Sequence, residues 1–504
     1  MRRLLALAAL TSLIAAGCAG DEDSSGPLDA ALAYLPAETP FAAAIDTDLD
    51  GDQYEAVDSL LGKFPLGVES VEEALAGQLS GGEQDVDFRE DVKPLLGNPF
   101  VVGATDVRSF TDDSEDDDFV GAIQVEDEDA LERLLDETKP SERGERSGAT
   151  VYEDAGTVFA VEEDMVVFAG SEQLLDEALE RADGDDHLDE ESFGEALEGL
   201  PRSALVRVYA DVEAIIAADP DARAARKVEW VRALRTLGST LVAEGEGLEI
   251  EFNLRTEGER LSDEDLPVAA GDEAPGVVER NGEIGFGIRD LAQIVKFSEA
   301  AGQALDPSGY GDYARAKETL DRQLGISIDE DLIGQLGGHL SASVAVDGKL
   351  GLRSELDDPR AFEDTLAKLA DALPSFAEGA GFGKVAIQKP EGDNDFYVLA
   401  QADGDSLVFG VIEETFVLAT DPERAAALAT EGPLEVPGAV GALAMSADAE
   451  TLVNALLGEL GPQLGLGGLE GFGAQLFTGP LEELTGSVRS STGGLRGRVS
   501  LSVR

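Results

Sequence analysis

The 504-residue sequence contains one cysteine, Cys18, and only two histidines, His187 and His339. A single cysteine excludes a disulfide framework within the chain, so stability must come from packing. Beyond the N-terminal segment, no stretch is long and apolar enough to cross a bilayer as a helix. The sequence also lacks a G-x-S-x-G elbow, an H-E-x-x-H motif, a P-loop and the Rossmann glycine pattern. We therefore predict that the protein is not an enzyme.

Basic side chains are scarce. The chain has 37 Lys and Arg against 104 Asp and Glu, which gives a formal net charge of −67. An acidic surface of this kind repels phosphates, so nucleic acid is excluded as a partner. Hydrophobic residues make up 43% of the chain, which is enough to bury a core. Two interpretations of the acidity fit the composition: solubility, or life at high salt, where screening removes self-repulsion.

The first residues have the pattern of an export signal. Arg2 and Arg3 precede the apolar run Leu4–Ala16, which is too short to span a bilayer. The run ends in Ala15-Ala16-Gly17-Cys18, which resembles the lipobox in which a cysteine thiol receives a diacylglyceryl group. We predict a signal peptide over 1–17, lipidation of Cys18 and a tether over 18–33; the alternative is an ordinary secretory signal cleaved nearby. Lipidation would anchor the protein outside the cytoplasm, on the cell membrane.

The body of the chain shows an internal duplication. Residues 158–172 (VFAVEEDMVVFAGSE) align without a gap with 408–422 (VFGVIEETFVLATDP). Each segment predicts a β-hairpin that leads into a helix capped near Ser171 or Asp421. Flanking strand and helix patterns recur in the same order in both halves, which favours two related repeats.

The alternation of period-2 and helical patterns predicts an α+β fold. We expect two similar halves, each an antiparallel sheet with helices packed on one face. The first repeat is predicted over 34–258, a linker over 259–281, and the second repeat over 282–504. Residues 458–474 are rich in Gly and Leu and would form a mobile apolar loop.

Acidic residues alternate in one loop that follows a predicted strand. Asp46, Asp48, Asp50 and Asp52 stand at every second position, with Gly51 between the last two. This is the first half of a calcium-loop pattern, although the final bidentate Glu is replaced by Val57. Two readings stay open: a weak calcium site, or a loop in which Asp50 or Asp52 caps the next helix.

The segment over 35–64 carries a family resemblance. The motif Leu35-Pro36-Ala37-Glu38-Thr39-Pro40, a strand, and then Asp50-Gly51-Asp52-Gln53 before a helix resemble the opening of a family of lipid-anchored lipoproteins from high-GC bacteria. That family is defined by a domain of unknown function. The resemblance implies an exported, lipid-anchored, duplicated α+β protein, and it carries over no catalytic or ligand-binding residue.

These observations favour a non-enzymatic binding module of the cell envelope. One version carries or senses an apolar ligand such as a lipid, and loop 458–474 would serve as its lid. The other is a protein-interaction or structural scaffold of the envelope without a small ligand. A cell-wall-acting enzyme is a third version, and it would require His339 to share a cleft with a carboxylate. We expect no cofactor other than weakly bound calcium.

Overall fold

The computed structural model describes most of the chain after the N-terminal segment. The described residues are 26–65, 67–79, 86–107, 119–154, 156–219, 222–278, 283–345, 348–379, 385–390, 396–400, 406–460 and 478–504. Cys18 and most of the loop 458–474 lie outside them, so the predictions made for these segments stay predictions.

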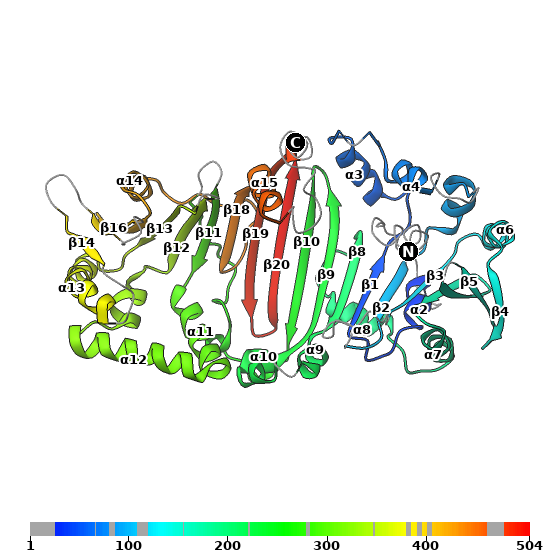
Figure 1. The fold of residues 1–504 in the computed structure, drawn as a ribbon, viewed down its shortest axis with the longest axis horizontal. Helices are drawn as coiled ribbons and strands as arrows, with labels where there is room; N and C mark the ends of the chain where they lie inside the picture. The colour runs from blue at the N-terminus through cyan, green and yellow to red at the C-terminus, as the bar shows by residue number, and fades with distance from the viewer. Residues whose placement is uncertain are drawn as a thin grey trace. The chain divides into compact units, whose positions relative to one another are not determined.

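The chain divides into two compact units. Figure 1 labels most of their helices and strands. The first unit comprises Met1–Arg223, Leu234–Thr256 and Ser502–Arg504, and the second comprises Ala224–Ala233 and Glu257–Leu501. The main boundary therefore falls close to the predicted end of the first repeat at residue 258.

The first unit carries an antiparallel sheet in the order β10-β9-β8-β1-β2-β3-β7-β6-β5-β4 among the described residues. Its strands are β1 (Phe41–Ile45), β2 (Phe100–Ala104), β3 (Phe119–Gln124), β4 (Ser141–Arg146), β5 (Ala149–Asp154), β6 (Thr157–Glu162), β7 (Met165–Ala169), β8 (Val206–Asp211), β9 (Leu234–Glu244) and β10 (Gly247–Thr256). Its helices are α2 (Pro27–Leu32), α3 (Asp52–Leu61), α4 (Val71–Leu79), α6 (Glu128–Thr138), α7 (Glu172–Ala182), α8 (Glu190–Ala196) and α9 (Val212–Ala218), with the short turns η1 (Phe88–Val92) and η2 (Lys93–Leu95).

The second unit carries a sheet in the order β20-β19-β18-β11-β12-β13-β17-β16-β15-β14 among the described residues, and the pairs from β19 to β14 are antiparallel. Its strands are β11 (Glu283–Arg289), β12 (His339–Ala345), β13 (Leu350–Glu355), β14 (Ala386–Gln388), β15 (Tyr397–Ala400), β16 (Ser406–Ile412), β17 (Thr415–Ala419), β18 (Leu443–Asp448), β19 (Leu481–Ser491) and β20 (Gly494–Val503). Its helices are α10 (Glu229–Ala233), α11 (Leu291–Leu305), α12 (Pro307–Leu324), α13 (Pro359–Gly379), α14 (Pro422–Thr430) and α15 (Ala449–Leu460). Short turns of helix are η3 (Ala222–Lys227), η4 (Gly258–Arg260), η5 (Asp263–Asp265), η6 (Ile328–Leu332) and η7 (Ile333–Gln335).

The two sheets have the same strand order when ten is added to each strand number of the first. The aligned hairpins of the sequence are β6–β7 and β16–β17, whose turns place Glu163 and Glu413 in the left-handed region at φ 52° and φ 56°. Each hairpin leads into a capped helix. The Ser171 hydroxyl accepts a hydrogen bond from the Leu174 amide at 3.3 Å, and the Asp421 carboxylate accepts one from the Arg424 amide at 2.8 Å. The α+β class with antiparallel sheets is confirmed.

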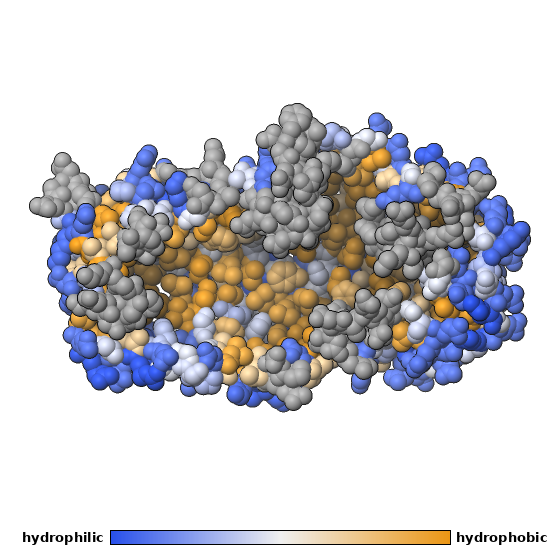
Figure 2. Space-filling view, in the orientation of Figure 1, coloured by the Kyte–Doolittle hydropathy of each residue, from blue (hydrophilic) through white to orange (hydrophobic). Residues whose placement is uncertain are grey.

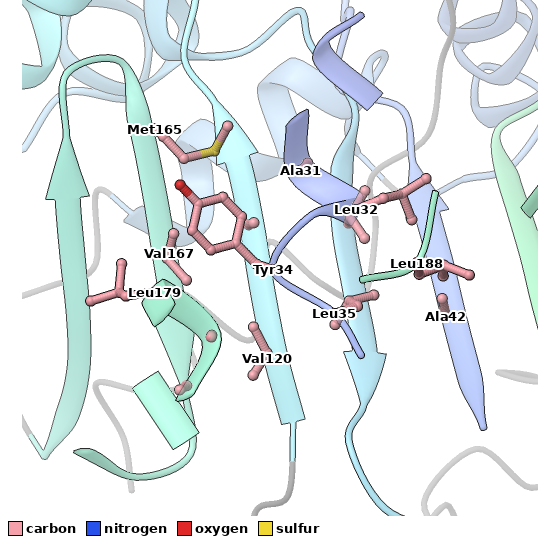
Figure 3. Close-up of a cluster of buried hydrophobic side chains, with 14 of the residues drawn as sticks. Ala31, Leu32, Tyr34, Leu35, Ala42, Val120, Met165, Val167, Leu179 and Leu188 are labelled. Carbon is pink, nitrogen blue, oxygen red and sulfur yellow. The ribbon is translucent and has the colours of Figure 1, made fainter. Parts of the chain in front are cut away.

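The core of the first unit begins at the start of the described chain. In α2, Leu28, Ala31 and Leu32 are buried against the sheet, and Leu35 follows them into the same cluster. Figure 3 shows Leu32, Tyr34 and Leu35 beside the strand residues Val120 and Val167. Burying each leucine contributes about 1.5–3 kcal/mol. Residues 27–33 therefore contribute Leu28, Ala31 and Leu32 to the core, and the predicted tether over 18–33 is too long at its C-terminal end.

The predicted linker over 259–281 is also packed. Leu266, Val268 and Val277 are buried within the second unit, and the Ser341 hydroxyl donates to the Gly276 carbonyl at 2.8 Å. Val268 packs in a buried cluster with Ala442, and Val277 packs in another with Ala444, which lies on β18. This stretch belongs to the second unit rather than joining the two.

Helices pack on both faces of the second sheet, which corrects the prediction of one covered face. Ala425 and Leu428 of α14 contact Val408, Val417 and Ala419. From the opposite side, Phe362 and Leu366 of α13 contact Phe409, Val411 and Phe416, which are the alternate residues of the same two strands.

A buried ion pair fixes α14 to the second sheet. The Arg424 guanidinium donates to both Glu283 carboxylate oxygens at 2.5 and 2.7 Å, and to the Ser343 hydroxyl oxygen at 2.7 Å. The side chains of Arg424 and Glu283 are 5% and 9% exposed. Removing one partner of such a pair leaves a buried charge without compensation.

We predict that Arg424→Met lowers the free energy of unfolding of the second unit by about 3–5 kcal/mol, because Glu283 is left buried without its ion-pair partner. The double variant Glu283→Leu/Arg424→Met should lose much less than the sum of the two single changes. Chemical denaturation of the four proteins measures this coupling. Lys296→Met, which breaks the exposed pair with Glu264, is the control and should have a far smaller effect. Additive single losses would contradict the prediction.

Candidate functional site

One face of the second sheet carries large apolar side chains that are only half-buried. A row across the strands runs through Phe286, Ala342, Leu352, Leu418 and Phe409, and Phe286 pairs on its other side with Met445. All of these residues are partly exposed. We call this surface the open face of the second unit; it also includes Ile284, Ile288, Val344, Leu399 and Leu443. At its edge, Tyr397, Val411 and Phe416 lie on the same side of the sheet and pack against α13.

On the opposite face of the sheet, the side chains are small and buried. The neighbouring row contains Gly285, Ser343, Gly351, Ala419 and Val408, all of them buried. A side-chain carbon on Gly351 would lie 2.6 Å from Leu428 and 2.7 Å from the Arg424 guanidinium. Small residues are thus required on the covered face, because α14 approaches it closely. In soluble proteins the large apolar residues usually face inward, so the open face is the anomaly of this sheet.

Figure 2 shows the consequence on the surface. A broad tract of hydrophobic side chains is visible over strands of the second unit such as β11 and β18. Val344, on β12, is 42% exposed. A continuous apolar tract of this kind marks a ligand or partner site more often than scattered surface residues do.

The open face of the first unit is aromatic. Phe100, Phe168, Phe159 and Tyr152 form a ladder across β2, β7, β6 and β5, with ring centroids 6.4, 5.9 and 5.4 Å apart. Gly121 lies between β2 and β7 in this row, and a side-chain carbon there would come within 2.9 Å of the Phe100 ring. Ile250, on β10, is 45% exposed. The same Tyr–Phe pair recurs in the second unit, where Tyr397 stacks on Phe409 at 5.3 Å.

The aspartate loop between β1 and α3 does not gather its four carboxylates. The Asp46 carboxylate accepts the Asp48 amide at 3.1 Å, and the Asp48 carboxylate accepts the Asp50 amide at 3.1 Å. Asp50 instead contacts Lys93 at 2.9 Å. The alternating aspartates thus accept hydrogen bonds from the backbone amides two residues further along the chain. Turns of this kind place acidic residues at the same spacing as a calcium loop does. Neither Asp50 nor Asp52 caps α3, which begins at Asp52 after Gly51 without a side-chain cap.

Across the described ranges, no three His, Cys, Asp or Glu side chains are grouped so that they could hold a metal ion. The calcium site at Asp46, Asp48, Asp50 and Asp52 therefore stays a prediction. Neither histidine belongs to a cluster of potential metal ligands among the described residues. His187 contacts the Gly184 carbonyl at 3.0 Å through Nδ1, and His339 is an exposed residue that begins β12.

Asp46 is nevertheless unusual. It is 4% exposed, and its Oδ2 atom has no hydrogen-bond partner among the described residues. Burial raises the pKa of Asp46 from 3.8 to about 7; Asp48 adds to the rise, while the amides of Asp48 and Thr47 and the charge of Arg207 oppose it. Burial in turn lowers the pKa of Arg207, which lies on the neighbouring strand β8.

The sequence matches the family described as "Protein of unknown function (DUF3352)" over residues 4–375. The chain belongs to this family. The match runs from the N-terminal segment through the first unit and into α13. No curated protein matches the chain significantly.

Solved structures give only a remote likeness. "Structure of crystal form III of TP0453" is 11% identical and covers 46% of this chain and 82% of its own, with a TM-score of 0.27. "Structure of crystal form I of TP0453" is 12% identical and covers 47% and 82%, with a TM-score of 0.27. Scores this low support no conclusion about fold or function. Among the described residues, no helix is both long and apolar enough to cross a membrane.

The sequence reasoning missed the open face, although a signal was present. β11 reads EIGFGIR and β13 begins LGLRS, so large apolar residues alternate with Gly, Ser or Arg. An alternation of this type usually places the large apolar residues inside and the polar residues outside. Here the face under α14 instead carries the small residues of these two strands, such as Gly285 and Gly351, whereas Phe286 and Leu352 are half-exposed.

We predict that Asp46→Asn stabilises the protein at pH 8 and changes little at pH 4. The folded pKa of Asp46 is raised to about 7, so its contribution to stability is intact below pH 4 and is lost as the pH rises through 7. The variant avoids that loss, a gain on the order of 3–4 kcal/mol at pH 8.

Thermal or urea denaturation of both proteins between pH 4 and 8 tests this prediction. Asp136→Asn, on the exposed side of α6, is the matched control and should track the wild type at every pH. Parallel stability curves for Asp46→Asn and the wild type would show that the Asp46 carboxyl titrates normally.

Proposed function

We propose that this protein is a lipoprotein of the bacterial cell envelope that binds an apolar ligand, such as a lipid, on the open face of the second unit. Lipid on Cys18 would hold it at the membrane, outside the cytoplasm. In this proposal it acts as a carrier or sensor and catalyses no reaction. The observation that carries the proposal is the half-exposed row through Phe286, Leu352 and Leu418, backed by a covered face of small residues.

The chemistry of this face favours hydrocarbon. Its central row across β18, β11, β12, β13, β17 and β16 holds Met, Phe, Ala and Leu, which offer no side-chain hydrogen bond to a polar ligand. Removing such side chains from water stabilises a complex by about 25 cal/mol per Å² of apolar surface. An acyl or prenyl chain is the simplest occupant, because it binds through apolar contact and needs no hydrogen bond.

We further propose that the two units arose by duplication of one ancestral repeat. The identical strand order, the matched hairpins with a left-handed Glu, and the two stacked Tyr–Phe pairs support this origin. On this view both open faces descend from one binding surface.

A scaffold without a small ligand is the second candidate. Its supporting observation is that the open face is a broad sheet surface, and an exposed apolar surface of this type also suits a protein partner. An enzyme acting on cell-wall material has no comparable support, since His339 stands at the exposed start of β12.

The carrier proposal predicts a co-purifying lipid. Protein isolated from the native envelope should show a stoichiometric lipid by native mass spectrometry combined with lipid extraction. A lipid-free protein in a stable complex with a second polypeptide would favour the scaffold instead.

A second prediction locates the ligand. The double variant Phe286→Gln/Leu352→Gln should weaken binding of the neutral dye N-phenyl-1-naphthylamine by roughly tenfold or more, because two large contacts are lost. Folding should be kept, since both side chains are half-exposed.

The matched control is Leu434→Gln/Val440→Gln, which removes apolar side chains that are 59% and 41% exposed and lie outside the sheet. It should leave dye affinity unchanged. Fluorescence titration gives the affinities, and circular dichroism reports the fold. Equal dye affinity in all three proteins would remove the open face as the binding site.

A further inference from the structure

A pocket opens at one end of the open face of the second unit. It lies between α13 and the strands β15 and β16, and its volume is about 580 Å³. Sites for small molecules commonly fall between about 300 and 1,000 Å³. The pocket is therefore large enough for a headgroup of several heavy atoms.

The inner wall of the pocket is apolar and continuous with the open face. Leu366 of α13 is buried, and Tyr397 and Val411 project from the sheet on the same side as Phe409. Tyr397 is stacked on Phe409 with an interplanar angle of 11°, which holds its ring in a fixed orientation. Tyr397 pairs with Phe409 and so extends the central row of the open face to the pocket, at the place where α13 packs on Phe409 and Val411.

The remaining wall is acidic. Glu363 and Asp364 of α13 and Glu413 of the β16–β17 turn line the pocket, and its described lining contains no Lys, Arg or His. These three carboxylates form no ion pair with any described residue. The nearby Lys389 pairs with Asp371 at 2.5 Å, and its charge also acts on Tyr397. The pocket thus combines an aromatic ring with three exposed carboxylates that form no ion pair with a described residue.

We infer that this pocket receives the ammonium headgroup of an amphiphile whose hydrocarbon chain lies on the open face. Carboxylates attract the positive charge, and the face of a tyrosine ring adds a cation–π contact. An anionic headgroup would meet three like charges in the same place. The inference rests on the proposed function and narrows its ligand class from lipids in general to those with a cationic nitrogen.

The experiment compares four probes on the intact mature protein by isothermal titration calorimetry, at concentrations below micelle formation. Decyltrimethylammonium carries the tail and the charge, decyl maltoside the tail alone, decyl sulfate the tail with the opposite charge, and tetramethylammonium the charge alone. Decyltrimethylammonium should bind at least roughly tenfold more tightly than each of the others.

The test variant is Glu363→Gln/Asp364→Asn/Glu413→Gln. It should lower the affinity for decyltrimethylammonium by roughly tenfold and leave decyl maltoside unchanged. The control variant is Glu132→Gln/Asp136→Asn/Glu163→Gln, which removes the same charge from α6 and the β6–β7 turn of the first unit. If the cation were attracted only by the overall charge of the protein, both variants would weaken it equally, and the inference would be overturned.

The outcomes distinguish the headgroup inference from the proposed apolar ligand site. Equal binding of the three tailed probes, unaffected by the test variant, overturns the headgroup inference and keeps the apolar ligand site. Tetramethylammonium binding as tightly as decyltrimethylammonium shows a site for a bare cation and overturns the inference as well. Absence of binding by every tailed probe overturns the proposed function itself.

Discussion

The close approach of backbone and helix to one face of the second sheet is the constraint on which its other features depend. A side-chain carbon on Gly287 would lie 2.6 Å from the Gly276 carbonyl oxygen, and Gly351 is equally crowded by α14. Strands with small residues on one face must place their large apolar residues on the other. The half-exposed row through Phe286 and Leu352 is thus the geometric counterpart of tight packing on the opposite side.

The same crowding explains the polar character of the covered face. Serines fit where larger side chains do not, and their hydroxyls find partners at short range, as Ser341 does with the Gly276 carbonyl. The Arg424–Glu283 pair is tolerated because both terminal guanidinium nitrogens donate and both carboxylate oxygens accept. The covered face therefore combines a buried polar network around Arg424 with the apolar contacts that Val408 and Val417 make with α14.

Many elements of the fold could be predicted from the sequence, and the predictions that were wrong or missing have physical reasons. The matched hairpins near Glu163 and Glu413 and their capped helices depend on local patterns, which a sequence displays directly. The buried position of α2 and of residues 266–278 depends on distant partners that no local pattern names. The loop that begins at Asp46 resembles a calcium loop in sequence, because carboxylates that accept backbone amides in turns have the same spacing as calcium ligands. The open face was missed because periodicity shows that a strand has two faces but not which one is covered.

The buried start of α2 has a mechanical consequence. Cys18 precedes the first helical residue, Pro27, by about nine residues, which can extend to roughly 30 Å at most. Tension on an anchor at that position would pass through this short segment directly to Leu28 and Leu32 in the core. If Cys18 carries the proposed lipid, membrane motion would therefore pull on the first unit through α2, and the packing of Leu28 and Leu32 would set the force that this unit withstands.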